Sequence, residues 1–371
     1  MLPIRSRRPP KRVLVVATPG FGDVLLATTL FRSIKRAYPD AAIDVLVHAG
    51  REEILVGNPD VANAIAMPKR ASVLQLIRLS AKIFGRYQLA VSPMGSDRLV
   101  FLARIASLRC LAMLDATAPR EAWKRWAVTA WVPRDADQQQ VLRHLHIADA
   151  LGIERAPAVV PPFDAAAPAQ LDEHVPFDWR TEPYAVLHPS THATRKRWTL
   201  DGWQTIGRRL VDRGWKCVIT GGPNEEPGYI ESILAAIGPD AVSLAGQLPL
   251  TAVRELIENS RAFVGVDTST AHLAAAVGTP TVALYGPGPT NRFTLWPHDY
   301  ESNEPPFWNV RGAATNGNVC LIQADCPCGK DYRGGCGTEM PGRSRCLEEL
   351  TTDFVVNAVE EFLDTRAADR A

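Results

Sequence analysis

Asp23 is the residue whose surroundings point most directly to chemistry. In RVLVVATPGFGDVLL, residues 13–17 have the apolar pattern of a buried parallel strand, residues 18–22 form a Gly/Pro turn, and a helix follows from Asp23. A free helix N-terminus attracts phosphate, but a carboxylate there opposes it. The turn is therefore a poor diphosphate site. Asp23 either caps its helix or acts as a base toward an uncharged group such as a sugar hydroxyl.

A second candidate site lies in the segment FVGVDTSTAHLAAAVGTP. A strand ends at Asp267, and an alanine-rich helix starts near Ser269. The helix N-terminus and the hydroxyls of Thr268 and Ser269 suit an anion, Asp267 suits sugar hydroxyls, and His272 lies one turn into the helix. The alternative is a capped helix with a satisfied histidine.

Two further segments follow predicted strand ends in the same half of the chain. LHPSTHATRKRW places Thr191 and Lys196 where a hydroxyl and a cation suit a diphosphate. ITGGPNEE places Glu225 where a carboxylate binds ribose hydroxyls in other α/β nucleotide sites. A solvated basic loop and a helix start are the structural alternatives.

These candidates need a sheet with helices on both faces, and the alternation of apolar segments predicts two such sheets. We expect an α/β protein in which two doubly wound, Rossmann-like domains face each other across a cleft. The expected parts are a basic tail over 1–12, a first domain over 13–155, a proline-rich linker over 156–183, a second domain over 184–349 with a cysteine-rich insert at 320–346, and a C-terminal helix over 350–371 that packs back on the first domain.

Composition excludes several classes of protein. The 371 residues carry 41 lysines and arginines against 40 acids, so we expect no nucleic-acid partner. No apolar run is long enough to span a membrane, and the start of the chain does not read as a signal peptide. We expect a cytoplasmic protein with reduced cysteines. Its basic tail either contacts an anionic membrane face, which would make the protein peripheral to the inner membrane, or is a solvated terminal segment.

The motifs together resemble a known family. The GFGDVL turn, KRW, TGGPNEE and VDTSTAHLAAAVGTPTVALYGP are similar to those of the glycosyltransferase family 9 heptosyltransferases of lipopolysaccharide core synthesis, over roughly residues 11 to 300. The stretch from GDVLLATTLF to LVGNPDV and the later NRFTLWPHDY most resemble the heptosyltransferase III branch. The resemblance implies a GT-B fold.

The resemblance also implies an inverting transfer of L-glycero-D-manno-heptose from ADP-heptose to a heptose hydroxyl of a lipid-linked core oligosaccharide, without metal or other cofactor. Asp23 matches the family's catalytic base. The donor-binding positions match Thr191 and Lys196 at the diphosphate, Glu225 at the ribose, Leu248 at the adenine, and Asp267, Thr268, Ser269 and His272 around the phosphate and heptose.

The chain departs from the family at several places. Ala17 stands where relatives often have lysine, and Ser269 where they have glycine. The insert holds five thiols without clean zinc-knuckle spacing, and we expect free thiols rather than a zinc or iron site at Cys320, Cys326, Cys328, Cys336 and Cys346.

A tryptophan-rich segment, REAWKRWAVTAW, mixes Trp123, Trp126 and Trp131 with basic residues, which suits either a membrane interface or a helix core.

Alternative functions remain open at the level of sequence. They are transfer of another nucleotide-linked sugar to a different glycan or protein, epimerisation of a sugar nucleotide, and non-catalytic binding of one. The acceptor and the linkage position are not encoded in any motif.

Overall fold

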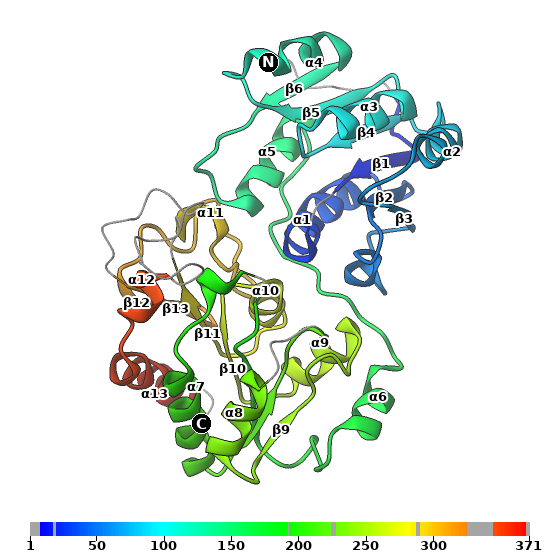
Figure 1. Cartoon of the computed structure of the whole chain (residues 1–371). Helices are drawn as coiled ribbons and strands as arrows, with labels where there is room; N and C mark the ends of the chain where they lie inside the picture. The colour runs from blue at the N-terminus through cyan, green and yellow to red at the C-terminus, as the bar shows by residue number, and fades with distance from the viewer. Residues whose placement is uncertain are drawn as a thin grey trace. The chain divides into compact units, whose positions relative to one another are not determined.

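The computed structural model describes residues 8–17, 20–191, 193–223, 228–286, 290–324 and 344–368. The chain divides into two compact units, one formed by Met1–Pro162 with Glu301–Pro305 and the other by Phe163–Tyr300 with Pro306–Ala371 (Figure 1). Each unit is built on one sheet covered by helices, so the expectation of two doubly wound α/β domains is confirmed.

The first unit contains a six-stranded parallel sheet in the order β3-β2-β1-β4-β5-β6. Its central strands are apolar and buried on both faces, which is the pattern that parallel sheets require. The strands are β1 (Arg12–Val16), β2 (Ala42–His48), β3 (Asn63–Met67), β4 (Leu89–Ser92), β5 (Cys110–Leu114) and β6 (Ala130–Pro133).

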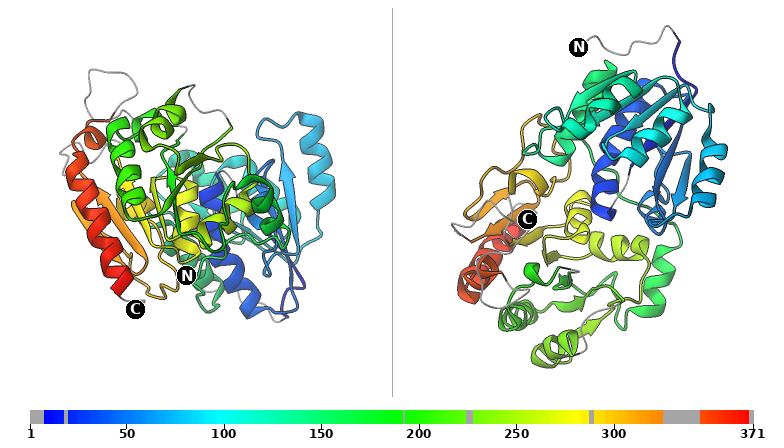
Figure 2. Two further views of the ribbon diagram at one scale, coloured as in Figure 1. Left: turned by 90° about the horizontal axis from the view of Figure 1, so that it is seen from below. Right: turned by 45° about the horizontal axis from the view of Figure 1, so that its top comes forward.

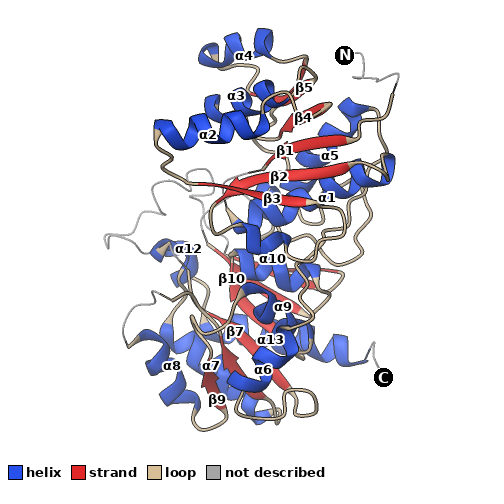
Figure 3. Cartoon of the chain, turned by 90° about the vertical axis from the view of Figure 1, so that its right-hand side faces the viewer, coloured by secondary structure: helices blue, strands red, loops and turns tan. Residues whose placement is uncertain are grey.

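Two helix layers cover this sheet. Figure 3 shows α2, α3 and α4 on one face and α1 and α5 on the other. The helices are α1 (Phe21–Ala37), α2 (Val73–Ile83), α3 (Asp97–Ala106), α4 (Ala122–Ala127) and α5 (Gln140–Leu151), with 3-10 turns η1 (Glu52–Leu55) and η2 (Pro119–Glu121).

The second unit contains a seven-stranded sheet in the order β12-β13-β11-β10-β7-β8-β9, in which only β12 is antiparallel. The strands are β7 (Tyr184–His188), β8 (Lys216–Ile219), β9 (Ala241–Ser243), β10 (Ala262–Val266), β11 (Thr281–Tyr285), β12 (Gly312–Asn316) and β13 (Val319–Gln323). The remaining elements are α6 (Ala167–His174), η3 (Thr194–Lys196), α7 (Leu200–Asp212), α8 (Tyr229–Ile237), α9 (Leu250–Glu258), α10 (Ser269–Ala276), α11 (Thr290–Phe293), α12 (Arg345–Glu348) and α13 (Thr352–Ala368).

The C-terminal helix differs from the expectation that it packs on the first domain. In Figure 2, α13 (red) lies beside the orange strands β12 and β13 of the second unit. Its apolar residues Val355, Val359 and Phe362 are buried in that unit's core, and α13 also contacts α7. The reason is that its apolar stripe completes the helix layer over β13, a strand that sequence patterns did not predict.

The predicted linker over 156–183 is also more structured than expected. Its first part is tied to α1, because the backbone N–H of Ala156 donates to Ser33 Oγ and that of Val160 donates to Thr28 Oγ1. Its second part forms α6 against α9, with Leu171 buried. No helix among the described residues is long and apolar enough to cross a bilayer.

Candidate active site

An ion pair marks the point in the second unit where strand order reverses. β7 lies between β8 and β10, so connections leave it in opposite directions, and such points bind ligands in open α/β sheets. Lys196, in the turn after β7, holds its Nζ 2.5 Å from Oδ2 of Asp267, which follows β10. The Lys196 ammonium also donates to the backbone carbonyl of Asp267 at 3.2 Å. The pair fixes a partly exposed cation at the carboxyl ends of two neighbouring strands.

The N-terminus of α10 lies beside this ion pair. Thr268 is the N-cap, and its hydroxyl accepts the backbone N–H of Ala271. Ser269 begins the helix, and His272 lies one turn further, 7% exposed. The predicted helix start is therefore correct. The N–H groups of the first turn and the helix dipole give this end of the strand a partial positive charge.

His272 is neutral at physiological pH. Burial lowers the pKa of its imidazole to about 4, with the nearby Asp267 raising it and Lys196 lowering it by smaller amounts. Its Nδ1 is buried and has no hydrogen-bond partner among the described residues. The alternative of a satisfied core histidine is thus not what the structure shows. A neutral imidazole can donate or accept one hydrogen bond to a bound ligand.

The segment that follows β7 contains a second polar side chain without a hydrogen-bond partner among the described residues. The hydroxyl of Ser190 is buried without a partner in the described part of the chain. Gly221, after β8, approaches it so closely that a Cβ there would lie 2.4 Å from Ser190 Oγ. Thr191 Oγ1 accepts the backbone N–H of Ala193, which leaves its hydroxyl hydrogen to donate. Small residues and spare donors therefore gather at the ends of β7 and β8.

Two predicted donor-site residues lie apart from this group. Leu248 is half-buried in the turn between β9 and α9, two strands from β7. Glu225 lies outside the described residues.

Asp23 occupies the corresponding position in the first unit. The strand order there reverses between β1 and β4, and α1 begins directly after β1. The helix starts at Phe21 with Gly20 as N-cap, so Asp23 is the third helical residue and not the cap. A Cβ at residue 20 would lie 3.0 Å from Asp23 Oδ2. Glycine thus leaves the carboxylate room above the helix end.

A buried hydrogen-bond network holds this carboxylate. Gln140, at the start of α5, donates from its amide nitrogen to Asp23 Oδ1 at 3.2 Å. Arg143 donates to Gln140 Oε1 at 2.6 Å, which fixes which end of the amide faces Asp23. The other Arg143 nitrogen donates to the backbone carbonyls of Asp135, Ala136 and Gln138. The loop before α5 therefore anchors the network.

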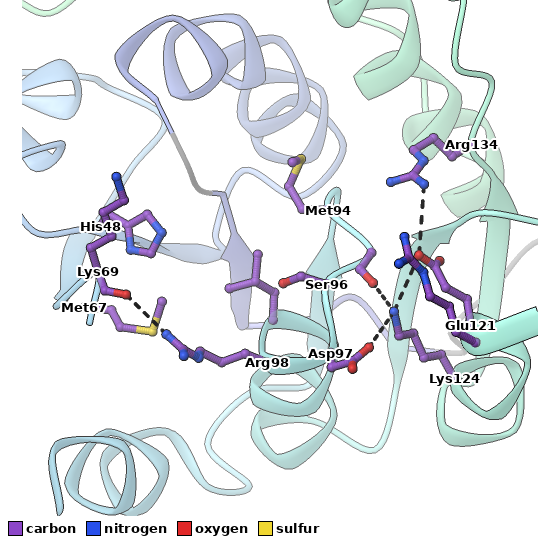
Figure 4. A pocket seen from close by; sticks show the side chains of 13 residues that line it. His48, Met67, Lys69, Met94, Ser96, Asp97, Arg98, Glu121, Lys124 and Arg134 are labelled. Atoms are coloured by element: carbon purple, nitrogen blue, oxygen red, sulfur yellow. Dashed lines mark hydrogen bonds and ion pairs between the residues drawn. The ribbon is translucent and has the colours of Figure 1, made fainter. Parts of the chain in front are cut away.

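Next to this strand end, the first unit has a cavity of about 670 Å³ that no sequence motif predicted (Figure 4). Its walls come from the carboxyl ends of β2, β3, β4 and β6 and from the first turns of α3 and α4. In the sheet, β1 lies between β2 and β4, two of the strands whose ends line the cavity. The lining residues are His48, Met67, Lys69, Met94, Gly95, Ser96, Asp97, Arg98, Leu99, Arg120, Glu121, Lys124 and Arg134.

The cavity is cationic. Lys124 is buried between two acids, with Nζ 2.7 Å from Asp97 and 3.6 Å from Glu121. No carboxylate of the described residues forms an ion pair with Lys69, Arg98 or Arg120. Sequence reasoning missed this site, although residues 61–96 contain five lysines and arginines and no acid. This local excess of basic over acidic residues was the sequence signal that could have indicated the site.

The remaining predictions concern the tryptophan-rich segment and the cysteines. Trp123 and Trp126 on α4 are 49% and 91% exposed, whereas Trp131 on β6 is half-buried under the guanidinium of Arg125.

Cys320 is buried in β13, and burial raises the pKa of its thiol to about 11, so it packs as a neutral side chain. Cys346 is buried in the same core, and Cys326, Cys328 and Cys336 lie outside the described residues.

Two doubly wound units, one with a carboxylate and the other with a cation and a helix N-terminus at its strand ends, define a glycosyltransferase of the GT-B class. The family model for glycosyltransferase family 9, the heptosyltransferases, matches residues 101–311. The chain belongs to this family.

Individual heptosyltransferases are also similar to this chain, in sequence and in fold. Lipopolysaccharide heptosyltransferase 3 of Escherichia coli is 27% identical over 298 residues, which are 75% of this chain and 87% of that protein. The structure of ADP-heptose lipopolysaccharide heptosyltransferase II of E. coli aligns with a TM-score of 0.72 at 21% identity, covering 96% of this chain and 99% of the other. E. coli heptosyltransferase WaaC, solved with ADP-2-deoxy-2-fluoro heptose, aligns with a TM-score of 0.65 at 20% identity over 96% and 99% of the two chains.

Proposed function

We propose that this enzyme transfers L-glycero-D-manno-heptose from ADP-heptose to a heptose hydroxyl of the lipid-linked inner core of lipopolysaccharide, with inversion at the anomeric carbon. The reaction takes place at the cytoplasmic face of the inner membrane. A lipopolysaccharide heptosyltransferase, an ADP-heptose lipopolysaccharide heptosyltransferase and a heptosyltransferase solved with a fluorinated ADP-heptose, all similar to this chain, support the choice of donor.

The second unit binds the donor in this proposal. The diphosphate lies between Lys196 and the N-terminus of α10, where the ammonium, the first-turn N–H groups and the Thr191 hydroxyl stabilise negative charge. Ser269 and the neutral His272 supply further hydrogen bonds. Glu225 binds the ribose and Leu248 packs on the adenine. Asp267 orients Lys196 and accepts from heptose hydroxyls.

Asp23 is the general base. Its carboxylate accepts the proton of the acceptor hydroxyl while the oxygen of that hydroxyl attacks the anomeric carbon from the face opposite ADP. The bond between that carbon and the diphosphate oxygen breaks, and ADP leaves with the electron pair. Lys196 and the α10 N-terminus stabilise the charge that grows on the leaving oxygen. A fixed cation in this position substitutes for a divalent metal, so the transfer needs none.

The cationic cavity of the first unit receives the acceptor. Lys69, Arg98 and Arg120 have no carboxylate partner there, so they are available to anionic groups such as the phosphates or carboxylates of core sugars. The strand that leads to Asp23, β1, lies between two strands whose ends line the cavity. An acceptor held by its charged groups would thus present a neutral hydroxyl to the base.

The observation that carries the proposal is the position of Asp23. It is a partly exposed carboxylate at the strand-order reversal of a cationic unit, and Gln140 holds it in place. Replacing it by Asn keeps the shape and removes the proton acceptor. We expect Asp23→Asn to lower kcat for heptose transfer by about 10² to 10⁴-fold. The measurement is mass spectrometry of the glycosylated acceptor after incubation with ADP-heptose.

Binding of ADP provides the control, because Asp23 lies outside the donor unit. Calorimetry should give the same affinity for the wild type and Asp23→Asn. Full transfer activity in the variant would refute the role of the base. Isomerised donor in the absence of acceptor would favour an epimerase, and unchanged core heptose in a strain lacking the gene would refute the acceptor assignment.

A further inference from the structure

The exposed apolar side chains of the first unit gather on one of its two helix layers. Among its described residues, the exposed large apolar side chains outside this layer are Val56 and Leu108. The others form what we call the α2–α4 face, with exposed fractions between 49% and 91%: Val73, Leu74 and Ile77 on α2, Phe84 at its C-cap, Phe101 on α3, and Trp123 and Trp126 on α4. The neighbouring positions of α2, α3 and α4 in Figure 3 make this a continuous layer.

Helix α2 has two apolar stripes. Leu76, Leu79 and Ile83 follow the i, i+3, i+7 pattern and pack on the core of the unit. Val73 and Ile77, one turn apart, point to solvent and are 74% and 58% exposed. A helix that only covers its own sheet needs apolar residues on the side that faces the sheet and none on the opposite side. The second stripe has no partner in the described part of the chain.

The same layer carries a strong positive charge. Between residues 61 and 127 there are eleven lysines and arginines and three acids, although the net charge of the whole chain is only +1. On α2 and just after it, Arg78, Lys82 and Arg86 are exposed. Apolar side chains flanked by cations are the pattern of a surface that lies on an anionic bilayer.

We infer that the α2–α4 face is a docking surface for an anionic lipid bilayer. The inference rests on the proposed function, because a lipid-linked acceptor is the reason for the enzyme to bind a bilayer. The cavity belongs to the same helix layer: Arg98 lies on α3, Lys124 on α4 and Arg120 just before it. A bilayer on this face therefore keeps the cavity close to the headgroups from which the acceptor sugars project. Association with a second copy through this face would bring two surfaces of like charge together, which is unfavourable.

The test compares vesicle binding by the full chain. We expect it to cosediment with vesicles of phosphatidylglycerol and phosphatidylcholine and to remain in solution with phosphatidylcholine alone. The triple variant Arg78→Gln, Lys82→Gln, Arg86→Gln removes three charges, and the triple variant Leu74→Ser, Ile77→Ser, Phe84→Ser removes apolar contact. Each should reduce partitioning onto the anionic vesicles by at least about tenfold. None of these residues lines the cavity.

Matched controls lie in the second unit. Arg208→Gln, Arg209→Gln, Arg261→Gln removes the same number of charges, and Trp308→Ser, Phe354→Ser removes exposed apolar side chains. Both should bind vesicles as the wild type does. Circular dichroism and thermal unfolding establish that every variant is folded.

The outcomes separate this inference from the proposed function. If both hold, the α2 variants keep full transfer to a delipidated, water-soluble oligosaccharide and lose transfer to acceptor in vesicles. Vesicle binding that depends on α2, without any heptose transfer, would support the surface and refute the activity. Equal binding by α2 variants and controls would overturn the inference, as would a dimer in light scattering that the apolar α2 variant dissociates.

Discussion

At the scale of single residues, the position of a carboxylate matters more than its identity. An aspartate in the first turn of a helix is commonplace and usually serves the helix itself. Asp23 is different because Gly20 caps the helix and Gln140 from α5 holds one carboxylate oxygen. A buried arginine, Arg143, fixes the orientation of the amide in turn.

Gln140 should therefore behave as a positioning residue. In the proposed mechanism, Gln140→Ala frees the Asp23 carboxylate to rotate, so we expect kcat to fall about tenfold with little change in KM for either substrate. Gln140→Glu places a second carboxylate beside the first and should move the acidic limb of the pH–rate profile to higher pH. Steady-state kinetics across pH measures both effects.

A glutamine elsewhere in the same unit provides the control for this prediction. Gln88 accepts the backbone N–H of Arg12 at the amino edge of the sheet, away from the strand ends that hold Asp23. Gln88→Ala should leave kcat unchanged. A Gln140→Glu profile that coincides with the wild type would mean that Gln140 serves folding alone.

Lys196 supports a second residue-scale prediction. In the proposed mechanism, removing its ammonium deprives the leaving diphosphate of its fixed cation, so Lys196→Met should lower kcat/KM for the donor by about 10² to 10³-fold. The wild type should keep full activity in EDTA, because the proposed mechanism uses Lys196 in place of a divalent metal. Coupled detection of released ADP measures both.

The matched control for Lys196 is another lysine–aspartate ion pair of the same sheet. Lys216 begins β8, at the amino edge, with Nζ 2.6 Å from Asp240 Oδ1. Lys216→Met removes a similar ion pair far from the strand ends that bind ligands and should leave kcat/KM nearly unchanged. Loss of activity in EDTA that magnesium restores would contradict metal independence.

At the scale of elements, the sequence was sufficient where the apolar pattern was regular. The expected strand over 13–17, the strand that ends at Asp267, the helix that starts near Ser269 and the C-terminal helix correspond to β1, β10, α10 and α13. Short strands such as β3 and β12 were missed because they lack a buried apolar run: three of the five residues of β3 are exposed, and none of β12 is fully buried. Helix α6 was hidden in a proline-rich segment, where Pro168 in the first turn starts a helix and does not break one.

The candidate site likewise combines residues that short sequence motifs identify with contacts that only the fold brings together. Sequence motifs found the residues at the ends of β7 and β10, since each lies within a few positions of a recognisable strand. The contact between Gln140 and Asp23 joins residues 117 positions apart, and the cavity draws on four strand ends. Such arrangements depend on the order of strands in the sheet, which periodicity alone does not determine.

At the scale of the whole molecule, the net charge is close to zero, although positive charge is concentrated in the first unit. The first unit carries the cationic cavity and the cationic α2–α4 face, and acids elsewhere in the chain balance them. Each unit also has its own apolar core and its own buried titratable groups. Because the cores are separate, the two units can differ in how their stability responds to pH.

Three buried histidines make this difference testable. Burial lowers the pKa of His144 in the first unit, and of His188 and His272 in the second, to about 4. In the unfolded chain each titrates near 6.5, so between these values the unfolded state binds more protons. The stabilisation from keeping them neutral is complete above about pH 6.5 and is lost as the pH falls toward 4. Each adds up to about 1.4 kcal/mol per pH unit to the slope of unfolding free energy.

Urea unfolding followed at pH 7.5, 6.0 and 5.0 should therefore show a steeper pH dependence for the second unit, whose described residues include two such histidines, than for the first, whose described residues include one. His144→Gln should flatten the slope of the first unit's transition only, and His188→Gln that of the second only, which also assigns the two transitions. If both variants kept the wild-type slopes, carboxylates and not the buried imidazoles would control acid stability. A single cooperative transition carrying the slopes of all three histidines would instead show that the units unfold together.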